Sequence, residues 1–254
     1  MPPQIQANMR ELSTDRGTVR IGTADEIYAE AAKLGTTAWR GAPTGRFSWA
    51  LTGGATPKAW YQWCTSHSAL TPQLVHETDW FVSDERCVPL GSDESNFGTA
   101  ERYLLGPNGV PPERRHPWPV QHAPEVAVAE FTQDAVARFG PRRAFDLCFL
   151  GLGNDTHTAS LFPGSALLAN DGGALFATVV VPGKGDRLTI TPTGLRACGR
   201  VVVMATGAAK AEAIRRVFRG GEAVQDVPAK VLASCAMRVV WLIDEAAAAG
   251  LRAS

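Results

Sequence analysis

The chain has 254 residues, 45% hydrophobic and 20% charged, a composition typical of a globular protein with a substantial core. Its 25 basic and 25 acidic residues give a formal net charge of zero, so no overall field attracts nucleic acid or a membrane surface, and we expect neither as a partner. No apolar run approaches the roughly 20 residues that span a bilayer, and a secretory signal pattern is missing, so a cytoplasmic protein with reduced thiols is predicted.

Residues 1–16 are polar, contain prolines and show no apolar periodicity, so we expect a flexible tail there. The remainder, residues 17–254, is expected to form a single α/β domain. Residues 24–39 are rich in alanine with helical spacing, which predicts a helix. Residues 47–51 form a short apolar run that is typical of a buried strand.

A glycine turn and the start of a helix follow this strand. Gly53 and Gly54 end the apolar run, and Pro57 suits the first turn of a helix for which Thr56 is the predicted N-cap. Residues 80–82 form a second short apolar run, which predicts another strand before an acidic turn.

The second half of the chain repeats this alternation. Residues 106–124 contain six prolines, which predicts a surface connection. After it we expect strands at residues 145–150, 201–204 and 239–243, and helices at residues 125–139, 208–218 and 244–249. The order of elements predicts a Rossmann-like parallel α/β sheet with helices on both faces.

Three segments that follow predicted strands carry polar or glycine residues, and ligands of an open parallel sheet bind outside the carboxyl ends of its strands. In the first segment, Gly53 and Gly54 let backbone amides approach an anion, and the helix N-terminus adds partial positive charge, which suits a phosphate. A tight turn that merely needs glycine explains the same residues equally well.

The second segment, residues 83–86, places two carboxylates and a guanidinium at a strand end. Asp84 and Arg86 are candidates for binding sugar hydroxyls and a carbonyl oxygen, and Asn96 is placed to add an amide contact. Taken alone, the segment is better explained as a solvated charged turn.

The third segment, residues 151–160, is glycine-rich and has Asp155 two residues before His157. Such an aspartate can orient and polarise the imidazole, and histidine is the side chain best suited to act as a general base at neutral pH. A loop histidine without a task is the alternative, but the position after a buried strand favours the functional interpretation.

Two cations of the C-terminal third are further candidates. Lys210 is expected in the first turn of a helix, where an ammonium gains nothing from the helix dipole unless an anion is bound there. Arg187 is expected in a loop before an apolar segment, and either cation alone is weak evidence. The five cysteines are odd in number and without a C-x-x-C pair, so no metal site is predicted.

Five ordered motifs resemble the 6-phosphogluconolactonase family, over roughly residues 20–249. These are LTGGATP (51–57), SDERCVP (83–89) with SN (95–96), FDLCFLGLGNDTHTASLFPG (145–164), RLTIT (187–191) and TGAAK (206–210). The resemblance implies the sugar-phosphate isomerase/deaminase type of fold. It also implies hydrolysis of 6-phospho-D-glucono-1,5-lactone to 6-phospho-D-gluconate in the oxidative pentose phosphate pathway, without metal or organic cofactor, by a monomer or homodimer.

The related glucosamine-6-phosphate deaminases share the glycine turn and the Asp-x-His loop. They resemble one another in a glutamate five residues after the histidine, where this chain has Phe162, and in an aromatic residue in place of Arg86. Phenylalanine cannot relay a proton, so both differences favour the lactonase. A deaminase or isomerase of the same fold, and a non-catalytic sugar-phosphate binder, remain the alternatives.

The resemblance, interpreted physically, assigns roles to the candidates. His157 would take a proton from the attacking water, and Asp155 would orient it or bind a sugar hydroxyl. The oxyanion would be stabilised by Arg86 or by a loop amide near Gly153. The phosphate would be held by four residues, Gly53, Gly54, Arg187 and Lys210.

The catalytic loop also departs from the family, which usually has Asp-Gly-His with a proline or similar residue before the aspartate. This chain has Asn154 and Thr156 at those two positions. If the usual glycine has a positive φ, then Thr156, which is β-branched, is expected to be strained.

Overall fold

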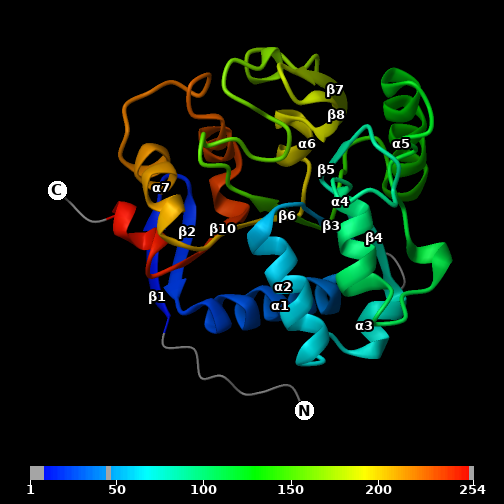
Figure 1. Ribbon diagram of the computed structural model, residues 1–254, viewed down its shortest axis with the longest axis horizontal. Helices are drawn as coiled ribbons and strands as arrows, with labels where there is room; N and C mark the ends of the chain where they lie inside the picture. Colours follow the sequence, from blue (N-terminus) through cyan, green and yellow to red (C-terminus); the bar gives the residue numbers. More distant parts are fainter. Residues whose placement is uncertain (1–8, 44–46, 252–254) are drawn as a thin grey trace.

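A seven-stranded sheet lies at the centre of the computed structural model, which describes residues 9–43 and 47–251 (Figure 1). Its strand order is β1-β2-β10-β9-β6-β3-β4, and every pairing in it except β1 with β2 is parallel. This arrangement confirms the predicted α/β class. The strands are β1 (Arg10–Thr14), β2 (Gly17–Gly22), β3 (Phe47–Leu51), β4 (Thr78–Val82), β6 (Leu147–Gly151), β9 (Arg200–Ala205) and β10 (Val239–Asp244).

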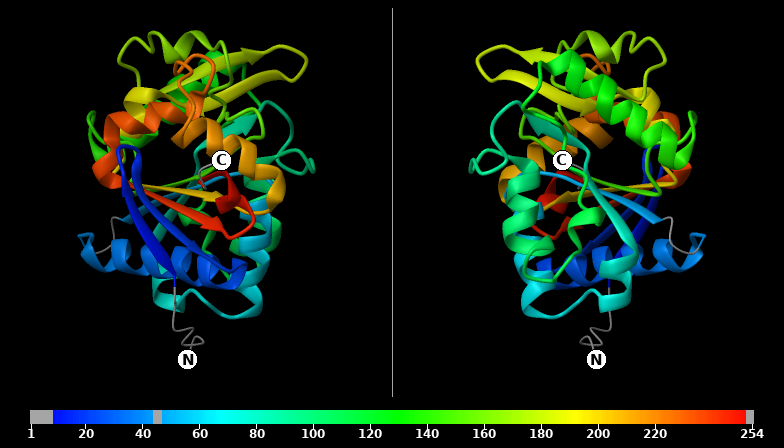
Figure 2. Two further views of the ribbon diagram at one scale, coloured as in Figure 1. Left: turned by 90° about the vertical axis from the view of Figure 1, so that its left-hand side faces the viewer. Right: turned by 90° about the vertical axis from the view of Figure 1, so that its right-hand side faces the viewer.

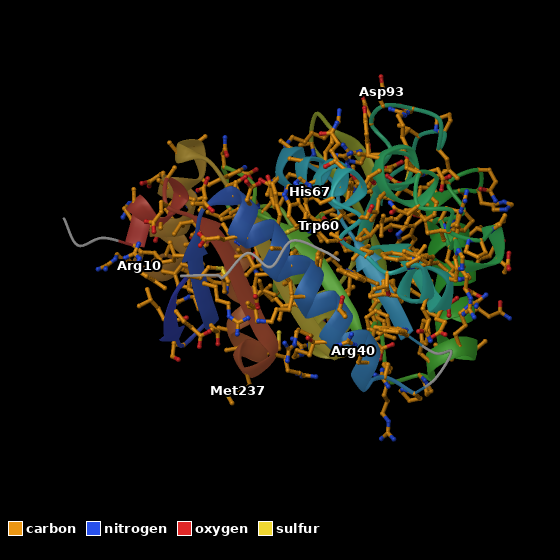
Figure 3. The ribbon with its side chains drawn as sticks, turned by 90° about the horizontal axis from the view of Figure 1, so that it is seen from below. Arg10, Arg40, Trp60, His67, Asp93 and Met237 are labelled. Carbon is orange, nitrogen blue, oxygen red and sulfur yellow. The ribbon has the colours of Figure 1, made fainter. Side chains whose placement is uncertain are left out.

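Helices pack against this sheet and protect its apolar strands from water. Figure 2 shows α1 on one side of the strands and residues 228–238 on the other, and Figure 3 shows α1 lying across them. The α-helices are α1 (Ala24–Gly41), α2 (Ala55–Ser66), α3 (Pro72–Glu77), α4 (Asn96–Ala100), α5 (Pro124–Phe139), α6 (Pro192–Arg196) and α7 (Ala211–Phe218). A π-helical turn spans Glu101–Leu105. 3-10 helices span Pro112–Arg114, Ala166–Leu168, Ala208–Lys210, Pro228–Arg238 and Ala247–Leu251.

Aromatic side chains fill the core between α1, α2 and the sheet. Trp49 of β3 stacks on Trp80 of β4 at 5.2 Å and meets Phe149 of β6 edge-on at 5.0 Å between ring centroids. A Cβ atom on Gly35 of α1 would lie 1.9 Å from the Trp49 ring, so only glycine lets the helix approach this closely. Close packing of these large side chains thus fixes the position of the strands. The polar residues follow at the carboxyl ends of the same strands, outside this core.

A second, three-stranded antiparallel sheet has the order β5-β8-β7 and was not predicted. It contains β5 (Asp84–Arg86), β7 (Phe176–Val181) and β8 (Gly185–Ile190). The expected acidic turn is therefore strand β5, and Arg187, expected in a loop, lies in β8. A strand of three charged residues is too short to show a hydrophobic periodicity. It forms because β8, about a hundred residues further along the chain, pairs with it.

The predicted tail is also wrong for the described residues 9–16, which form β1 and the turn to β2. This strand lies at the edge of the sheet with exposed side chains, so its residues show no apolar pattern. Residues 1–8 lie outside the described part of the chain.

The helix α2 begins two residues earlier than predicted. Gly54 rather than Thr56 is the N-cap, and Thr56 lies inside the helix, where its hydroxyl contacts the Thr206 hydroxyl at 2.8 Å. Across residues 9–43 and 47–251, no helix has the length and apolarity needed to cross a membrane.

Candidate active site

A cleft of about 660 Å³ opens beyond the carboxyl ends of β3, β4, β6 and β9. Each of these strands is followed by a segment that reaches the cleft, as expected for an open parallel sheet. The cleft is lined by Gly53, Gly54, Asp84, Arg86, His157 and Lys210 among the predicted site residues. Residues far apart in the sequence are thus brought together at one edge of the sheet.

Two predicted residues do not line this cleft. Asp155 is hydrogen-bonded to His157 and is not itself among the residues that line the cleft. Arg187 lines an adjoining cleft of about 650 Å³, which shares Gly54, Ala55, Arg86 and Asn96 with the first. Lys210 and Arg187 therefore occupy different clefts, and the structure does not bring the four predicted phosphate ligands into one.

Asp155 and His157 form a close hydrogen-bonded pair. The Nδ1 atom of His157 lies 2.5 Å from Oδ1 of Asp155, and the backbone N–H of His157 donates to the same oxygen at 3.2 Å. The hydrogen bond from His157 is the main cause that lowers the pKa of Asp155, to about 2. An ionised carboxylate at Nδ1 favours the tautomer with the proton on Nδ1, which leaves Nε2 free to accept a proton. The geometry thus favours the orienting role of Asp155.

Gly153 and Phe162 frame the imidazole. A Cβ atom on Gly153 would lie 2.0 Å from Nδ1 of His157, so a side chain there would displace the ring. The N–H of Gly153 donates to the His157 carbonyl at 2.8 Å. The phenyl ring of Phe162 stacks on the imidazole with centroids 4.2 Å apart and planes inclined by 22°. From the sequence, Phe162 was informative only as a missing proton relay, and its contact with His157 was not predicted.

Thr156 has a φ of 70° and is fully buried, so the expected backbone strain is present. Its hydroxyl donates to the Asp155 carbonyl at 2.5 Å, and its own carbonyl accepts a hydrogen bond from the N–H of Ala229 at 3.1 Å. Contacts on both sides of the residue hold the loop in this conformation.

Replacing Thr156 with glycine and with alanine separates this strain from the loss of the buried side chain. Both variants lose the hydroxyl and methyl groups, but only glycine adopts a positive φ without cost. We expect Thr156→Gly to be more stable than Thr156→Ala by about 0.5–1 kcal/mol, after the entropic cost of glycine is subtracted. Urea unfolding of both variants measures the difference. A more stable alanine variant would show that the loop in solution lacks the positive φ.

The acidic segment is buried rather than solvated. Asp84 accepts hydrogen bonds from the hydroxyls of Ser160 at 2.8 Å and Ser83 at 3.2 Å, and the Asn96 amide donates to its carbonyl at 2.8 Å. Burial raises the pKa of the neighbouring Glu85, although backbone N–H groups and the Ser95 hydroxyl donate to its carboxylate. Glu85 thus holds β5 against α4, while Asp84 remains at the cleft surface.

The cations of the two clefts differ in their surroundings. Arg86 and Arg187 are directly opposite in the β5–β8 pairing, and the pKa of Arg187 is lowered by burial first and by Arg86 second. Lys210 donates to Oδ1 of Asn154 at 2.8 Å, and burial lowers its pKa while Asp155 acts in the opposite direction. Within the described chain, none of the three forms an ion pair with a carboxylate, which leaves their charge available to an anion.

No three histidine, cysteine or acidic side chains among the described residues are grouped so as to hold a metal ion.

Comparison with known proteins gives consistent matches. A family model described as glucosamine-6-phosphate isomerases/6-phosphogluconolactonase matches residues 22–241. A Synechocystis protein named 6-phosphogluconolactonase is 33% identical over 216 residues, covering 83% of this chain and 87% of the relative. The human GDH/6PGL endoplasmic bifunctional protein is 33% identical over 208 residues, which are 79% of this chain but only 26% of that protein.

The fold is likewise similar to solved structures. The structure of 6-phosphogluconolactonase from Trypanosoma brucei superposes with a TM-score of 0.79 at 25% identity, covering 93% of this chain and 99% of that one.

Proposed function

The chain belongs to the family of glucosamine-6-phosphate isomerases and 6-phosphogluconolactonases, and on that premise we propose that it hydrolyses 6-phospho-D-glucono-1,5-lactone to 6-phospho-D-gluconate. This reaction belongs to the oxidative pentose phosphate pathway. The observation that carries the proposal is the Asp155–His157 pair at the cleft, with the Phe162 ring rather than a carboxylate packed on the imidazole.

In the proposed mechanism, Nε2 of His157 takes a proton from a water molecule as its oxygen attacks C1 of the lactone. Asp155 holds the proton on Nδ1 and stabilises the imidazolium that forms. The tetrahedral intermediate then collapses, the bond between C1 and the ring oxygen breaks, and the imidazolium returns its proton to that oxygen. The lactone carbonyl is already electrophilic, so these steps need no organic cofactor.

Arg86 is the better of the two candidates for stabilising the oxyanion. The amide of Gly153 is already used by the His157 carbonyl. The guanidinium of Arg86 lines the cleft, donates one N–H to the Glu94 carbonyl and has no carboxylate partner among the described residues, so it has further N–H groups and its charge to offer. Asp84, whose carboxylate is buried at the same wall, would accept hydrogen bonds from sugar hydroxyls.

The phosphate is proposed to lie against the start of α2, where Gly53 and Gly54 bring backbone amides to the cleft. Lys210 lines the same cleft and supplies a cation whose charge is not neutralised by a carboxylate. Arg187 contributes if the phosphate extends into the adjoining cleft.

Variants of the two cations decide which cleft holds the phosphate. Loss of a charge-assisted hydrogen bond costs about 1.5–3 kcal/mol, so Lys210→Met should raise KM at least about tenfold with a smaller change in kcat. Arg187→Met should do the same only if the phosphate reaches the adjoining cleft. Steady-state kinetics with the phosphorylated lactone measure both, and Lys33→Met, an exposed position on α1 outside both clefts, is the control. A wild-type KM in either variant removes that side chain from the phosphate site.

Deamination is the rival reaction of the same family, and the Phe162 contact opposes it. A phenyl ring lies where a deaminase needs a carboxylate to relay a proton, in direct contact with the imidazole.

The test of the proposed function offers the protein both substrates in parallel. Freshly prepared 6-phosphogluconolactone is followed with its spontaneous hydrolysis subtracted, and glucosamine 6-phosphate is followed by ammonia release. We expect lactone hydrolysis without ammonia release. Ammonia release without lactone turnover would make the protein a deaminase, and thermal stabilisation by 6-phosphogluconate without either reaction would make it a binding protein.

A further inference from the structure

Phe162 contacts two side chains, those of His157 and Lys184. Its ring stacks on the His157 imidazole at 4.2 Å, and the ammonium of Lys184 lies over the same ring, 4.5 Å from its centroid. The phenyl ring therefore links the ammonium of Lys184 to the imidazole of His157. A cation on a phenyl face is attracted by the electron density of the ring.

Lys184 comes from a part of the fold that the proposed mechanism does not use. It lies in the turn that joins β7 to β8, where Gly183 and Gly185 have φ values of 73° and 75° and the N–H of Lys184 donates to the Val181 carbonyl at 2.9 Å. Positive φ values on both sides make this a tight turn. The Lys184 side chain is exposed, so the contact with Phe162 is not forced by burial.

The Asp155–His157 hydrogen bond alone does not fix the orientation of the imidazole. A hydrogen bond tolerates a range of distances and angles, so a single bond to Nδ1 still allows the ring some rotation about the Cα–Cβ and Cβ–Cγ bonds. Such rotation would move Nε2, and a misplaced base loses much of its effect on the rate. A flat contact on the imidazole restricts this rotation, and Phe162 provides it.

We propose that Phe162 and Lys184 are positioning residues, which together hold the His157 ring in the plane that directs Nε2 to the substrate. This inference rests on the proposed role of His157 as the base. The phenyl ring stacks on the imidazole, and the cation–π contact with the ammonium restrains the phenyl ring. Neither side chain contacts the substrate or transfers a proton.

The stack has a spectroscopic signature that does not depend on activity. The chain has five histidines, so a carbon–proton NMR spectrum of the imidazoles contains five sets of signals, and His157→Ala identifies the set of His157. The ring current of Phe162 shifts these signals upfield. We expect Phe162→Leu to move them downfield, Phe162→Tyr to leave them near their original positions, and Lys184→Met to move them part of the way.

The same variants have a kinetic signature. Phe162→Leu should lower kcat about five- to tenfold and Lys184→Met about two- to fivefold, the ranges that an aromatic stack and an exposed cation–π contact support. KM should be nearly unchanged, because neither residue lines the cleft. Lys184→Arg keeps a cation over the ring and should restore both the NMR positions and kcat. Lys33→Met removes a lysine charge from an exposed site on α1 and should change neither.

The outcomes distinguish this inference from the proposed function. His157 signals that do not move in Phe162→Leu, or Lys184→Met with the signals and kcat of the wild type, would overturn the positioning role. A shift of the signals in a protein that hydrolyses no lactone would leave the stack in place and reject the function. An equal loss of kcat in Lys184→Arg and Lys184→Met would show that the charge plays no part.

Discussion

Replacing His157 with alanine should lower kcat for lactone hydrolysis by about 10²- to 10⁴-fold, the usual contribution of a positioned general base. The imidazole lines the cleft, and its Nδ1 is engaged by Asp155, so Nε2 is the atom available to accept a proton from water. Alanine leaves no group at this position that can take the proton. The binding of the product, 6-phosphogluconate, should be weakened far less, because the proposed phosphate site at the start of α2 does not include His157.

The test of His157→Ala measures both the rate of lactone hydrolysis and the affinity for the product. The rate is followed with freshly prepared lactone and corrected for spontaneous hydrolysis, and product affinity is measured by titration. His76→Ala, the same substitution at an exposed position on α3, is the control and should have the wild-type kcat. Equal losses in kcat and product affinity would show that His157 merely helps to hold the ligand.

The second large effect is expected from Asp155→Asn. The neutral amide no longer favours the proton on Nδ1 and no longer stabilises the imidazolium, so kcat should fall by about 10²- to 10⁴-fold. KM should stay close to the wild-type value, because Asp155 does not line the cleft. A large rise in KM with little change in kcat would instead assign Asp155 to a sugar hydroxyl.

The lowered pKa of Asp155 in the wild type predicts how the effect of this substitution depends on pH. With a pKa of about 2, the wild-type carboxylate is ionised at all pH values near neutrality. Titration of Asp155 is complete below about pH 4, so above that pH it should contribute no change to the ratio of wild-type to variant kcat. Asp134→Asn on α5 has a matched exposure of 44% and a carboxylate paired with Arg138, and it should leave kcat unaffected.

The central sheet could be predicted because its strands are continuous apolar runs. Residues 47–51, 201–204 and 239–243 were each predicted within one or two residues, since strands covered on both sides need apolar side chains on both faces. The candidate cleft could be predicted for the same reason, because polar and glycine residues after such strands gather at one edge of the sheet.

The second sheet could not be predicted, because its short strands depend on each other rather than on their own composition. Asp84, Glu85 and Arg86 form a strand only because β8 pairs with them. The positions of Phe162 and Lys184 relative to His157 depend on the path of a hairpin and on side-chain direction, which no local pattern records. The same limit applies to Arg187, whose side chain reaches a different cleft from that of Lys210.

The pairing of β5 with β8 has a consequence for the order of folding. Asp84 lies opposite Thr189, so the pairing that forms one wall of the cleft closes a long loop of chain that contains β6, Asp155 and His157. Closing that loop costs conformational entropy, and only the three residue pairs between β5 and β8 offset this cost once they have formed. We therefore expect the β5–β8 pairing to form after the central sheet, so that the cleft is completed later in folding than the hydrophobic core.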